Sequence, residues 1–573
     1  MFDTAFLTLG LRRSRALGLA AVAGCGGTGP VDPSQACGAQ PVTVLAVGQH
    51  VVLDPAASDG CLRIPEAGPA GAQYLLVLAS TNGARSANGI QGTYLLRASS
   101  PAVSPGPAGV SVSAAGPAQA AALRVAPLGL GGPVSAWFDA TLRAREREVA
   151  ADPVSRRPLV APTPLAAPPP LGEVRTFKVC SSLKCTGFTD VTATARYVGE
   201  HSAVYLDNEA NSFLTDPVTD GDLAELGFAF DIWHYPIDTT AFGRESDIDG
   251  NGVVIILMTK AVNDLTPDCE AGRVVGYFFG GDLLVRDNSN RAEIFFTLVP
   301  APATPKCSAV SPRAVLNNAK ATLMHEFQHM INFNQHVLKR PGGSEDTWLN
   351  EALAHYAEEL GGRLIPSAEC EAFGFPSCRS QYSSGNLING YNYLRATDTN
   401  FVVFPNSKQG TLAERGAGWL LLRWAIDQFA GDSILGTAMT RDLVETSQTG
   451  AANLTAATGE GLAVMIPEWL LALYLDDGSD LPSEPTGRLR FKSWGFRAIW
   501  SDPDNFTTGF PLVPPSISGN FLRSGALKAG SGQHFLVLQG ASGAAINLQA
   551  LKNSGGARLD PALQARFGVV RIR

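Results

Sequence analysis

The chain has 573 residues, of which 45% are hydrophobic and 17% are charged. This length corresponds to roughly three or four domains, and the apolar content is sufficient for sizeable cores, which excludes wholesale disorder. The net charge of −8, without a Lys/Arg-rich run past residue 15, argues against a nucleic-acid partner.

The first 24 residues are typical of a bacterial secretory signal peptide. A basic segment precedes a short apolar stretch, too short to span a bilayer, and small residues lead to Cys25. The ending Val22–Cys25 resembles the lipobox of bacterial lipoproteins, which implies that Cys25 is acylated. We therefore expect an exported lipoprotein that contacts the outer membrane or cell surface only through this lipid, with residues 25–40 as a tether. Secretion after a plain signal peptide is the alternative.

The other eight cysteines form an even set, which predicts disulfides in an exported protein. No pair of them has the spacing of a zinc ribbon, so we interpret them as structural. Pairing of sequence neighbours would join Cys37 to Cys61, Cys180 to Cys185, Cys269 to Cys307 and Cys370 to Cys378.

The pattern of apolar residues divides the chain into several units. Short alternating runs over residues 41–145 predict an N-terminal β-sandwich-like domain, and the proline-rich residues 146–172 a semi-rigid linker. Strand patterns over 173–310, followed by helical periodicity over 311–505, predict one α+β domain. Strands return in a C-terminal β-domain at 506–573. The expected architecture is therefore multidomain and mixed, with an α+β domain flanked by two β-sandwich-like domains.

The segment His325-Glu326-Phe327-Gln328-His329 has the HExxH pattern within a stretch of helical periodicity. Residues four apart share one face of a helix, so both imidazoles can bind one Zn²⁺ ion. Glu326 would lie close to the metal without binding it, where it can take a proton from bound water.

A third metal ligand is expected from a second helix. The chain lacks the Gly and His that metzincins carry after the motif, and His336 cannot fold back along the same straight helix. The segment Trp348-Leu-Asn-Glu-Ala-Leu-Ala-His-Tyr-Ala-Glu358 supplies a better candidate, Glu351. We therefore predict one Zn²⁺ per chain, held by His325, His329 and Glu351.

Two residues of the second helix are candidates for hydrogen bonds to the imidazole nitrogens that do not bind the metal. Glu358 lies two turns after Glu351 on the same face, and a metal-bound histidine usually needs a carboxylate on its second ring nitrogen. Asn350 is the second candidate. The alternative for Glu358 is a solvated acid at the end of a helix.

These motifs resemble those of known peptidase families. HExxH, followed about 20 residues later by Asn-Glu on a second helix, resembles the gluzincin clan. The segment Trp348–Glu358 is similar to the WLNEGFAxYxE helix of the aminopeptidase N family, and HEFQHMINF with its flanking β regions is most similar to the hyicolysin family of bacterial neutral metallopeptidases. The resemblance covers roughly residues 173–480. It implies an α+β zincin fold and zinc-dependent hydrolysis of a protein or peptide substrate, with Glu326 as general base and acid.

Two departures from the aminopeptidase pattern affect the expected activity. Ala413-Glu414-Arg415-Gly416 stands where that family has a Tyr before its Lys/Arg-Gly helix start. The group that stabilises the oxyanion must then lie elsewhere, and Tyr391, Tyr393 and His355 are candidates, each with simple packing as the alternative. No Gly-Ala-Met-Glu-Asn stretch occurs, which favours an endopeptidase over an aminopeptidase. A surface adhesion or scaffold lipoprotein with a vestigial peptidase site is the non-enzymatic alternative.

Residues 247–252 have the first half of a calcium-binding loop. Asp247, Asp249 and Asn251 offer oxygen ligands at alternate positions before Gly252. The bidentate Glu of such loops is missing, because the twelfth position is Met258. A polar β-turn is therefore the alternative to a weak Ca²⁺ site.

Overall fold

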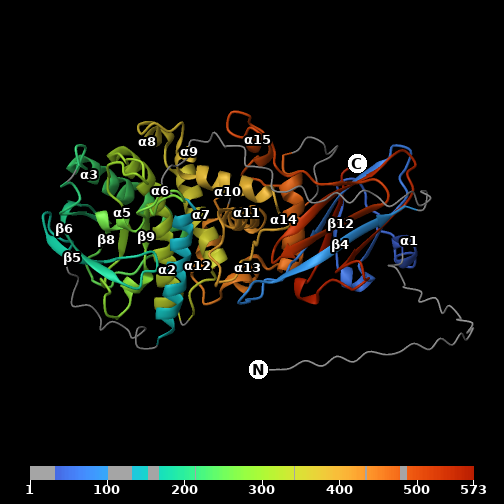
Figure 1. The fold of residues 1–573 in the computed structure, drawn as a ribbon, viewed down its shortest axis with the longest axis horizontal. Helices are drawn as coiled ribbons and strands as arrows, with labels where there is room; N and C mark the ends of the chain where they lie inside the picture. Colours follow the sequence, from blue (N-terminus) through green and yellow to red (C-terminus); the bar gives the residue numbers. More distant parts are fainter. Residues whose placement is uncertain are drawn as a thin grey trace, which may run out of the picture.

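The computed structural model describes residues 32–100, 132–152, 167–212, 214–340, 342–432, 435–477 and 487–573. The molecule is elongated, with a mixed sheet and its helices at one end, further helices in the middle and a β part at the other end (Figure 1). Cys25 and the signal peptide expected before it lie outside the described residues.

A six-stranded mixed sheet forms one end of the molecule. Its order is β5 (Val174–Cys180), β6 (Phe188–Val198), β7 (Ser202–Asp207), β8 (Val254–Met258), β10 (Ile294–Thr297) and β9 (Gly276–Phe278). The strands β7, β8 and β10 run parallel to one another, and β9 pairs antiparallel with β10 at the edge. The residues of β8 are all buried, as expected of a continuous apolar run in a parallel sheet. Among the described strands, the sheet thus ends on the short β9, and no further strand pairs with its free edge.

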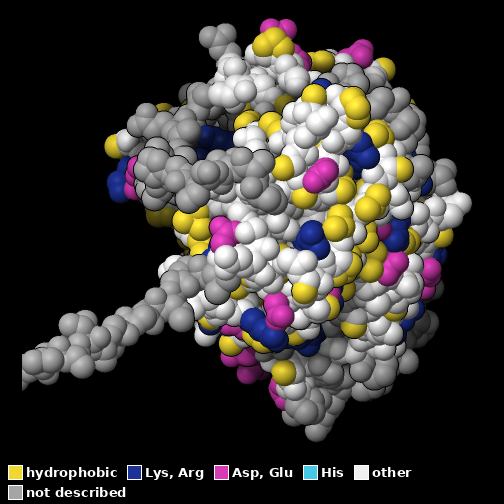
Figure 2. All heavy atoms as spheres, turned by 90° about the vertical axis from the view of Figure 1, so that its right-hand side faces the viewer, with side chains coloured by type: hydrophobic (Ala, Val, Ile, Leu, Met, Phe, Trp, Pro, Cys, Tyr) yellow, Lys and Arg dark blue, Asp and Glu magenta, His cyan; other side chains and the backbone are white. Residues whose placement is uncertain are grey.

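Strands from the two ends of the chain form the β part together. One sheet has the order β1 (His50–Leu53), β15 (Arg566–Arg571), β3 (Ala72–Ala79), β13 (Gly532–Gln539) and β11 (Ser516–Ile517); the other has β12 (Phe521–Lys528), β4 (Gln91–Ser99), β14 (Ile546–Leu551) and β2 (Cys61–Ile64). Figure 2 views this end, where acidic and basic side chains are interspersed.

The expectation of separate N- and C-terminal β-domains is therefore corrected. The strand β3 has a C-terminal strand on each side, β13 and β15, and β4 lies between β12 and β14. Leu76 of β3, Leu96 of β4 and Val537 of β13 belong to one apolar cluster, so the two sheets share a core. Neither end of the chain could complete these sheets alone, because strands of one end fill the edges of the other.

The helix α2 (Pro133–Ala151) crosses the boundary that we expected at residues 145 and 146. Pro133 occupies the first turn, where its missing N–H costs no hydrogen bond, and the following run rich in Ala, Arg and Glu favours a helix. The linker expected from residue 146 therefore does not begin there. At the start of the region where we expected alternating strands, Val42 forms only an isolated bridge.

Some helices pack on the mixed sheet, and others fill the middle of the molecule (Figure 1). Those nearest the mixed sheet are α3 (Asp220–Ala229), η2 (Phe230–His234), α4 (Tyr235–Phe242), α5 (Lys260–Asp264), η3 (Gly280–Leu283), α6 (Pro312–Phe333) and η4 (Asn334–Lys339). The next are α7 (Thr347–Leu364), α8 (Ser367–Glu371), α9 (Cys378–Tyr382), α10 (Ser384–Leu394), α11 (Leu412–Phe429), α12 (Thr437–Val444), α13 (Gly450–Thr458), α14 (Leu462–Leu475) and α15 (Phe496–Trp500). The short α1 (Pro33–Ala36), η1 (Pro55–Ser58) and η5 (Pro561–Leu563) belong to the β part.

Four disulfides cross-link the described chain, and the predicted pairing of sequence neighbours is confirmed. They join Cys37 to Cys61, Cys180 to Cys185, Cys269 to Cys307 and Cys370 to Cys378. Within the described ranges, no helix by itself has the length and apolar content needed to cross a membrane; only α13 and α14 taken together do, with a bend of 81° between them.

Candidate metal centre

The two histidines of the HExxH motif lie one turn apart on α6 and converge. Ser311 caps this helix by accepting a hydrogen bond from the N–H of Ala314, and the helix is buried from Leu323 to its end. The Nε2 atoms of His325 and His329 are 3.2 Å apart. The side chains of both residues are almost fully buried, at 8% and 0% exposure.

Glu351 reaches the same point from α7. Its Oε2 lies 3.6 Å from Nε2 of His325, and its Oε1 lies 3.8 Å from Nε2 of His329. The three side chains offer ligand atoms that all lie within 4.8 Å of one another. The structure therefore brings together the three residues that we predicted as metal ligands.

Oxygen atoms on α7 orient both imidazoles. Nδ1 of His325 lies 2.8 Å from Oε1 of Glu358, and Nδ1 of His329 lies 3.0 Å from Oδ1 of Asn350. A carboxylate and an amide oxygen only accept hydrogen bonds, so each Nδ1 carries the proton. Each Nε2 then presents a lone pair, which is the arrangement found at metal-bound histidines.

The atoms at the centre of the site fit a divalent cation. When both rings are neutral, their two lone pairs 3.2 Å apart repel each other, and a cation bound between them removes that repulsion. Nitrogens about 2.0–2.1 Å from a tetrahedral zinc ion would be separated by about 3.3 Å, close to this distance. In addition, Oε1 of Glu351 is buried without a hydrogen-bond partner among the residues that the structure describes. A bound cation would satisfy all three groups.

The sequence did not reveal the role of Arg415 in this site. Its Nη1 donates a hydrogen bond to Oε2 of Glu351 at 2.6 Å, which leaves Oε1 as the unpartnered oxygen. Arg415 lies in the first turn of α11, where Thr411 and Glu414 form a capping box. It is far from Glu351 along the chain, so no local spacing could have predicted the contact.

The surrounding charges shift the pKa values of the three candidate ligands in different directions. Burial acts to lower the pKa of His325, but Glu351 and Glu358 outweigh it and raise the pKa well above its usual value. Burial and the charge of Arg143 hold the pKa of His329 well below that value. For Glu351, burial is outweighed by Arg415 and the histidines, which hold its pKa well below the usual range. Glu351 is therefore ionised at neutral pH, as a metal ligand must be.

Glu326 lies next to His325 on α6 and contacts the edge strand. Its Oε2 accepts a hydrogen bond from the N–H of Phe278 in β9, at 3.0 Å. Burial and the charge of Asp139 raise the pKa of Glu326 to about 8. The backbone of β9 therefore fixes the position of this carboxylate beside the metal site.

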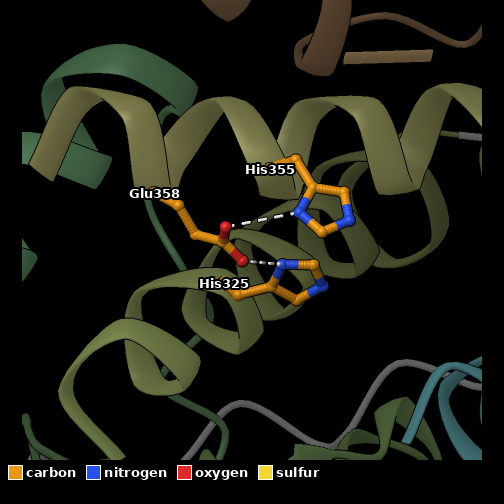
Figure 3. Close-up of side chains that lie close together, drawn as sticks. All are labelled: His325, His355 and Glu358. Carbon is orange, nitrogen blue, oxygen red and sulfur yellow. Dashed lines mark hydrogen bonds and ion pairs between the residues drawn. The ribbon is translucent and has the colours of Figure 1, made fainter. Parts of the chain in front are cut away.

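Glu358 bridges two histidines, as Figure 3 shows. Its Oε1 lies 2.8 Å from Nδ1 of His325, and its Oε2 lies 3.3 Å from Nδ1 of His355. The two rings are in edge contact with their centroids 4.9 Å apart. The Nε2 atoms of both rings lie on the side away from Glu358, and that of His355 is buried without a hydrogen-bond partner.

The structure does not bring Tyr391 and Tyr393 to the metal site. The hydroxyl of Tyr391 is in close contact with that of Thr508, and its ring lies against Phe506. Tyr393 is fully buried, and its ring stacks on Trp469. Both residues lie in α10 and pack away from the ligands, which leaves His355 as the nearest of the three candidates.

In the loop that resembles a calcium site, side-chain oxygens accept hydrogen bonds from backbone N–H groups of the same loop. Asp247 accepts one from the N–H of Gly252, and Oδ1 of Asn251 accepts one from the N–H of Val253. The acidic side chains that could hold a cation here are those of Asp247, Asp249 and the buried Glu293. Calcium binding at this loop stays a prediction.

Comparison with known proteins gives one informative match. Over 194 residues, which are 33% of this chain, it is 32% identical to the neutral metalloprotease ShpI of Staphylococcus hyicus. The matched part covers 40% of that relative. No family model matches the chain.

Proposed function

We propose that this chain is a metal-dependent peptidase and, in finer detail, a zinc endopeptidase of the gluzincin type. The observation that carries the proposal is the convergence of two imidazole lone pairs on the unpartnered Oε1 of Glu351. Histidine nitrogens with one carboxylate are a ligand set of catalytic zinc sites. The similarity to a neutral metalloprotease supports the same class of reaction.

In the proposed reaction, His325, His329 and Glu351 hold the metal. Zinc bound there would lower the pKa of a water molecule to about 7 and polarise the carbonyl of the substrate. Glu326 accepts the proton of the attacking water on its carboxylate and donates it to the amine that leaves. The hydrogen bond from Phe278 to Oε2 orients this carboxylate, so that Oε1 exchanges the proton.

His355 is our candidate for the group that stabilises charge on the substrate carbonyl oxygen. Its Nε2 is buried and unpartnered, and it projects to the same side as Nε2 of His325 (Figure 3). Glu358 accepts from Nδ1 of His355, so Nε2 donates only from the doubly protonated ring. In that form it is a hydrogen-bond donor aimed at the oxygen, and such a donor contributes a factor of about 10²–10³ to kcat. We expect the kcat of His355→Phe to be lower than that of the wild type by this factor, while zinc content and KM stay unchanged. Loss of zinc from this variant would instead indicate that His355 supports metal binding and does not stabilise charge on the substrate.

The Glu326→Gln variant tests the reaction itself. We expect this variant to keep zinc, because Glu326 is not a proposed ligand. Its rate of casein hydrolysis should fall by a factor of about 10²–10⁴. The measurement pairs metal analysis with the rate for the wild type and the variant. Equal rates would contradict the assignment of Glu326, and bound zinc without turnover in the wild type would favour a non-enzymatic surface protein.

Peptides with free and with blocked N-termini distinguish the two peptidase types. An endopeptidase hydrolyses both kinds at similar rates, because it does not recognise the terminal amine. An aminopeptidase requires that amine, so preference for the free peptides would overturn the proposal of internal cleavage.

Export as a lipoprotein is part of the same proposal. The four disulfides support export, since such bonds persist in oxidising compartments. Incorporation of labelled palmitate should occur in the wild type and be lost in Cys25→Ser. Equal labelling of both proteins would exclude Cys25 as the lipid site.

A further inference from the structure

The candidate metal site is closed to solvent in the full chain. Glu351 is fully buried, and Glu326 is only 2% exposed. A peptidase must admit an extended polypeptide to its metal, so residues that now cover the site have to move before a polypeptide can bind. The helix α2 is the element that covers it. In Figure 1 it stands, in cyan, between the mixed sheet and the central helices.

On one side, α2 occupies the free edge of β9. Arg143 donates a hydrogen bond to the carbonyl of Phe278 at 2.6 Å, and Glu146 accepts one from the N–H of Gly280 at 2.7 Å. The ring of Phe138 lies edge-on to Tyr277, with centroids 5.1 Å apart. An exposed strand edge binds extended peptides through such backbone groups. These groups lie beside Glu326, and α2 engages them with its own side chains.

On its other side, α2 is held by the helices that carry the metal site. Arg147 donates hydrogen bonds to Oγ1 of Thr347, at the start of α7, and to the carbonyl of Asn406, both at 2.8 Å. Arg415, the partner of Glu351, donates one to the carbonyl of Ala136 at 2.7 Å. The helix therefore spans the opening between β9 and α7.

One carboxylate of α2 reaches the charged groups of the site. Oδ2 of Asp139 lies 3.4 Å from Nη1 of Arg415, the same nitrogen that contacts Glu351. Oδ1 of Asp139 is buried, and within the described part of the chain it has no hydrogen-bond partner. A carboxylate with a spare oxygen close to a metal site is suited to interact with a cation bound there.

We propose that α2 is an inhibitory helix, which closes the metal site of the full chain and must leave β9 and Arg415 before a polypeptide can bind. This inference rests on the proposed peptidase function and adds its regulation. In this account the buried polar contacts of α2 keep the enzyme latent, and their loss opens the site.

The helix itself offers a matched pair of variants. Arg143 and Glu146 form a buried ion pair at 2.9 Å; Arg143 also binds Phe278 at the end of β9, and Glu146 binds Gly280 at the start of η3. Arg145 and Glu148 form the same kind of pair at 2.7 Å, with the same spacing, but Glu148 is 67% exposed. The variant R143M/E146Q removes the ion pair and the hydrogen bond to Phe278, and it leaves only a neutral amide oxygen to accept from Gly280. R145M/E148Q makes the same substitutions on the exposed face.

The probe is a fluorescent peptide hydroxamate, which chelates zinc and reports access to the site without turnover. We expect R143M/E146Q to bind it at least about tenfold more tightly than the wild type and to hydrolyse casein correspondingly faster. R145M/E148Q should behave as the wild type. Arg147→Met, which loosens the other side of α2, provides a second variant should the double variant not fold.

Hydrogen exchange at the amide of Gly280 gives a readout that needs neither zinc nor activity. Exchange there should be faster in R143M/E146Q than in the wild type and the control. Equal hydroxamate affinity in all proteins with zinc bound, or lower activity in the α2 variants, would overturn inhibition by this helix. Hydroxamate binding without casein hydrolysis by any variant would instead contradict the proposed peptidase function.

Discussion

At the scale of single residues, Arg415 links two carboxylates of the site. It pairs with Glu351 at 2.6 Å and lies 3.4 Å from Asp139, and its side chain is buried with them. Removing one partner of a buried ionic pair costs about 3–5 kcal/mol, because a charge is left without compensation. A group that orients a metal ligand typically contributes 10–100-fold in metal affinity.

We therefore expect Arg415→Met to weaken zinc binding by about 10–100-fold and to lower stability. The zinc affinity and the stability of Arg415→Lys should lie between those of Arg415→Met and the wild type, because a single ammonium cannot reproduce the planar donors of a guanidinium. Competition with a chromophoric chelator measures the affinities. Wild-type zinc affinity in Arg415→Met would show that this guanidinium does not orient Glu351.

The meeting of His325, His329 and Glu351 could be predicted from sequence because their spacing is local to two helices. Two histidines four apart share a helix face, and Glu351 follows in a second helix with its own apolar period. Arg415 and Asp139 could not be predicted in the same way. Their contacts join separate parts of the chain, and a single Arg or Asp has no periodic signal.

At the scale of elements, the packing of α10 against α11 sets the position of Arg415. A Cβ atom on Gly416 would lie 2.3 Å from the backbone carbon of Asn389. The two helices approach this closely only because residue 416 has no side chain. The neighbouring residue in α11 is Arg415, so a displacement of the helix would also move its guanidinium.

We expect Gly416→Ala to destabilise the protein by about 1–3 kcal/mol, because backbone atoms must move apart. Gly385→Ala is the matched control, since a Cβ there meets nothing within 4 Å and residue 385 also lies in a helix. Its effect should be neutral or slightly stabilising, by up to about 1 kcal/mol. Thermal unfolding of the two variants checks this. Equal unfolding temperatures would contradict the close packing at Gly416.

Element types followed from sequence where apolar periodicity was strong. Within the region of expected strands lies β8, and within the region of expected helical periodicity lie α6 and α7. The helix α2 was missed because we gave its nearby prolines more weight than its run of good helix formers. Pro133 is compatible with that helix because it lies in the first turn.

At the scale of the whole molecule, His534 joins the β part to the central helices. It lies in β13, and its Nε2 donates a hydrogen bond to the carbonyl of Leu470 in α14 at 2.8 Å. Burial lowers the pKa of His534 from about 6.5 to about 4. The unfolded chain therefore binds a proton at a higher pH than the folded chain, and stability is lost as the pH falls from 6.5 towards 4.

We expect the wild type to lose about 2 kcal/mol more stability than His534→Gln between pH 7 and pH 5. The comparison uses metal-free protein, so that titration of the metal ligands contributes equally to both. Unfolding in denaturant at the two pH values measures it. An equal loss in the two proteins would mean that His534 is not kept neutral by burial.

The assembly of the β part could not be predicted from sequence. Periodicity showed strands at both ends of the chain, but it carries no information on which strands pair across several hundred residues. Because β3 pairs with β13 and β15, the strands expected in two separate domains form one β part. By contrast, disulfide partners lie close in sequence, and they were predicted correctly.

The most direct test of the account is the zinc content of Glu351→Ala. The central claim is that α6 and α7 hold one divalent ion between His325, His329 and Glu351. Glu200→Ala is the control, because that side chain is 82% exposed. After gel filtration in zinc-free buffer, the account predicts about one zinc per chain in the wild type and the control, and almost none in Glu351→Ala. A Glu351→Ala protein that retains a full equivalent of zinc would contradict it.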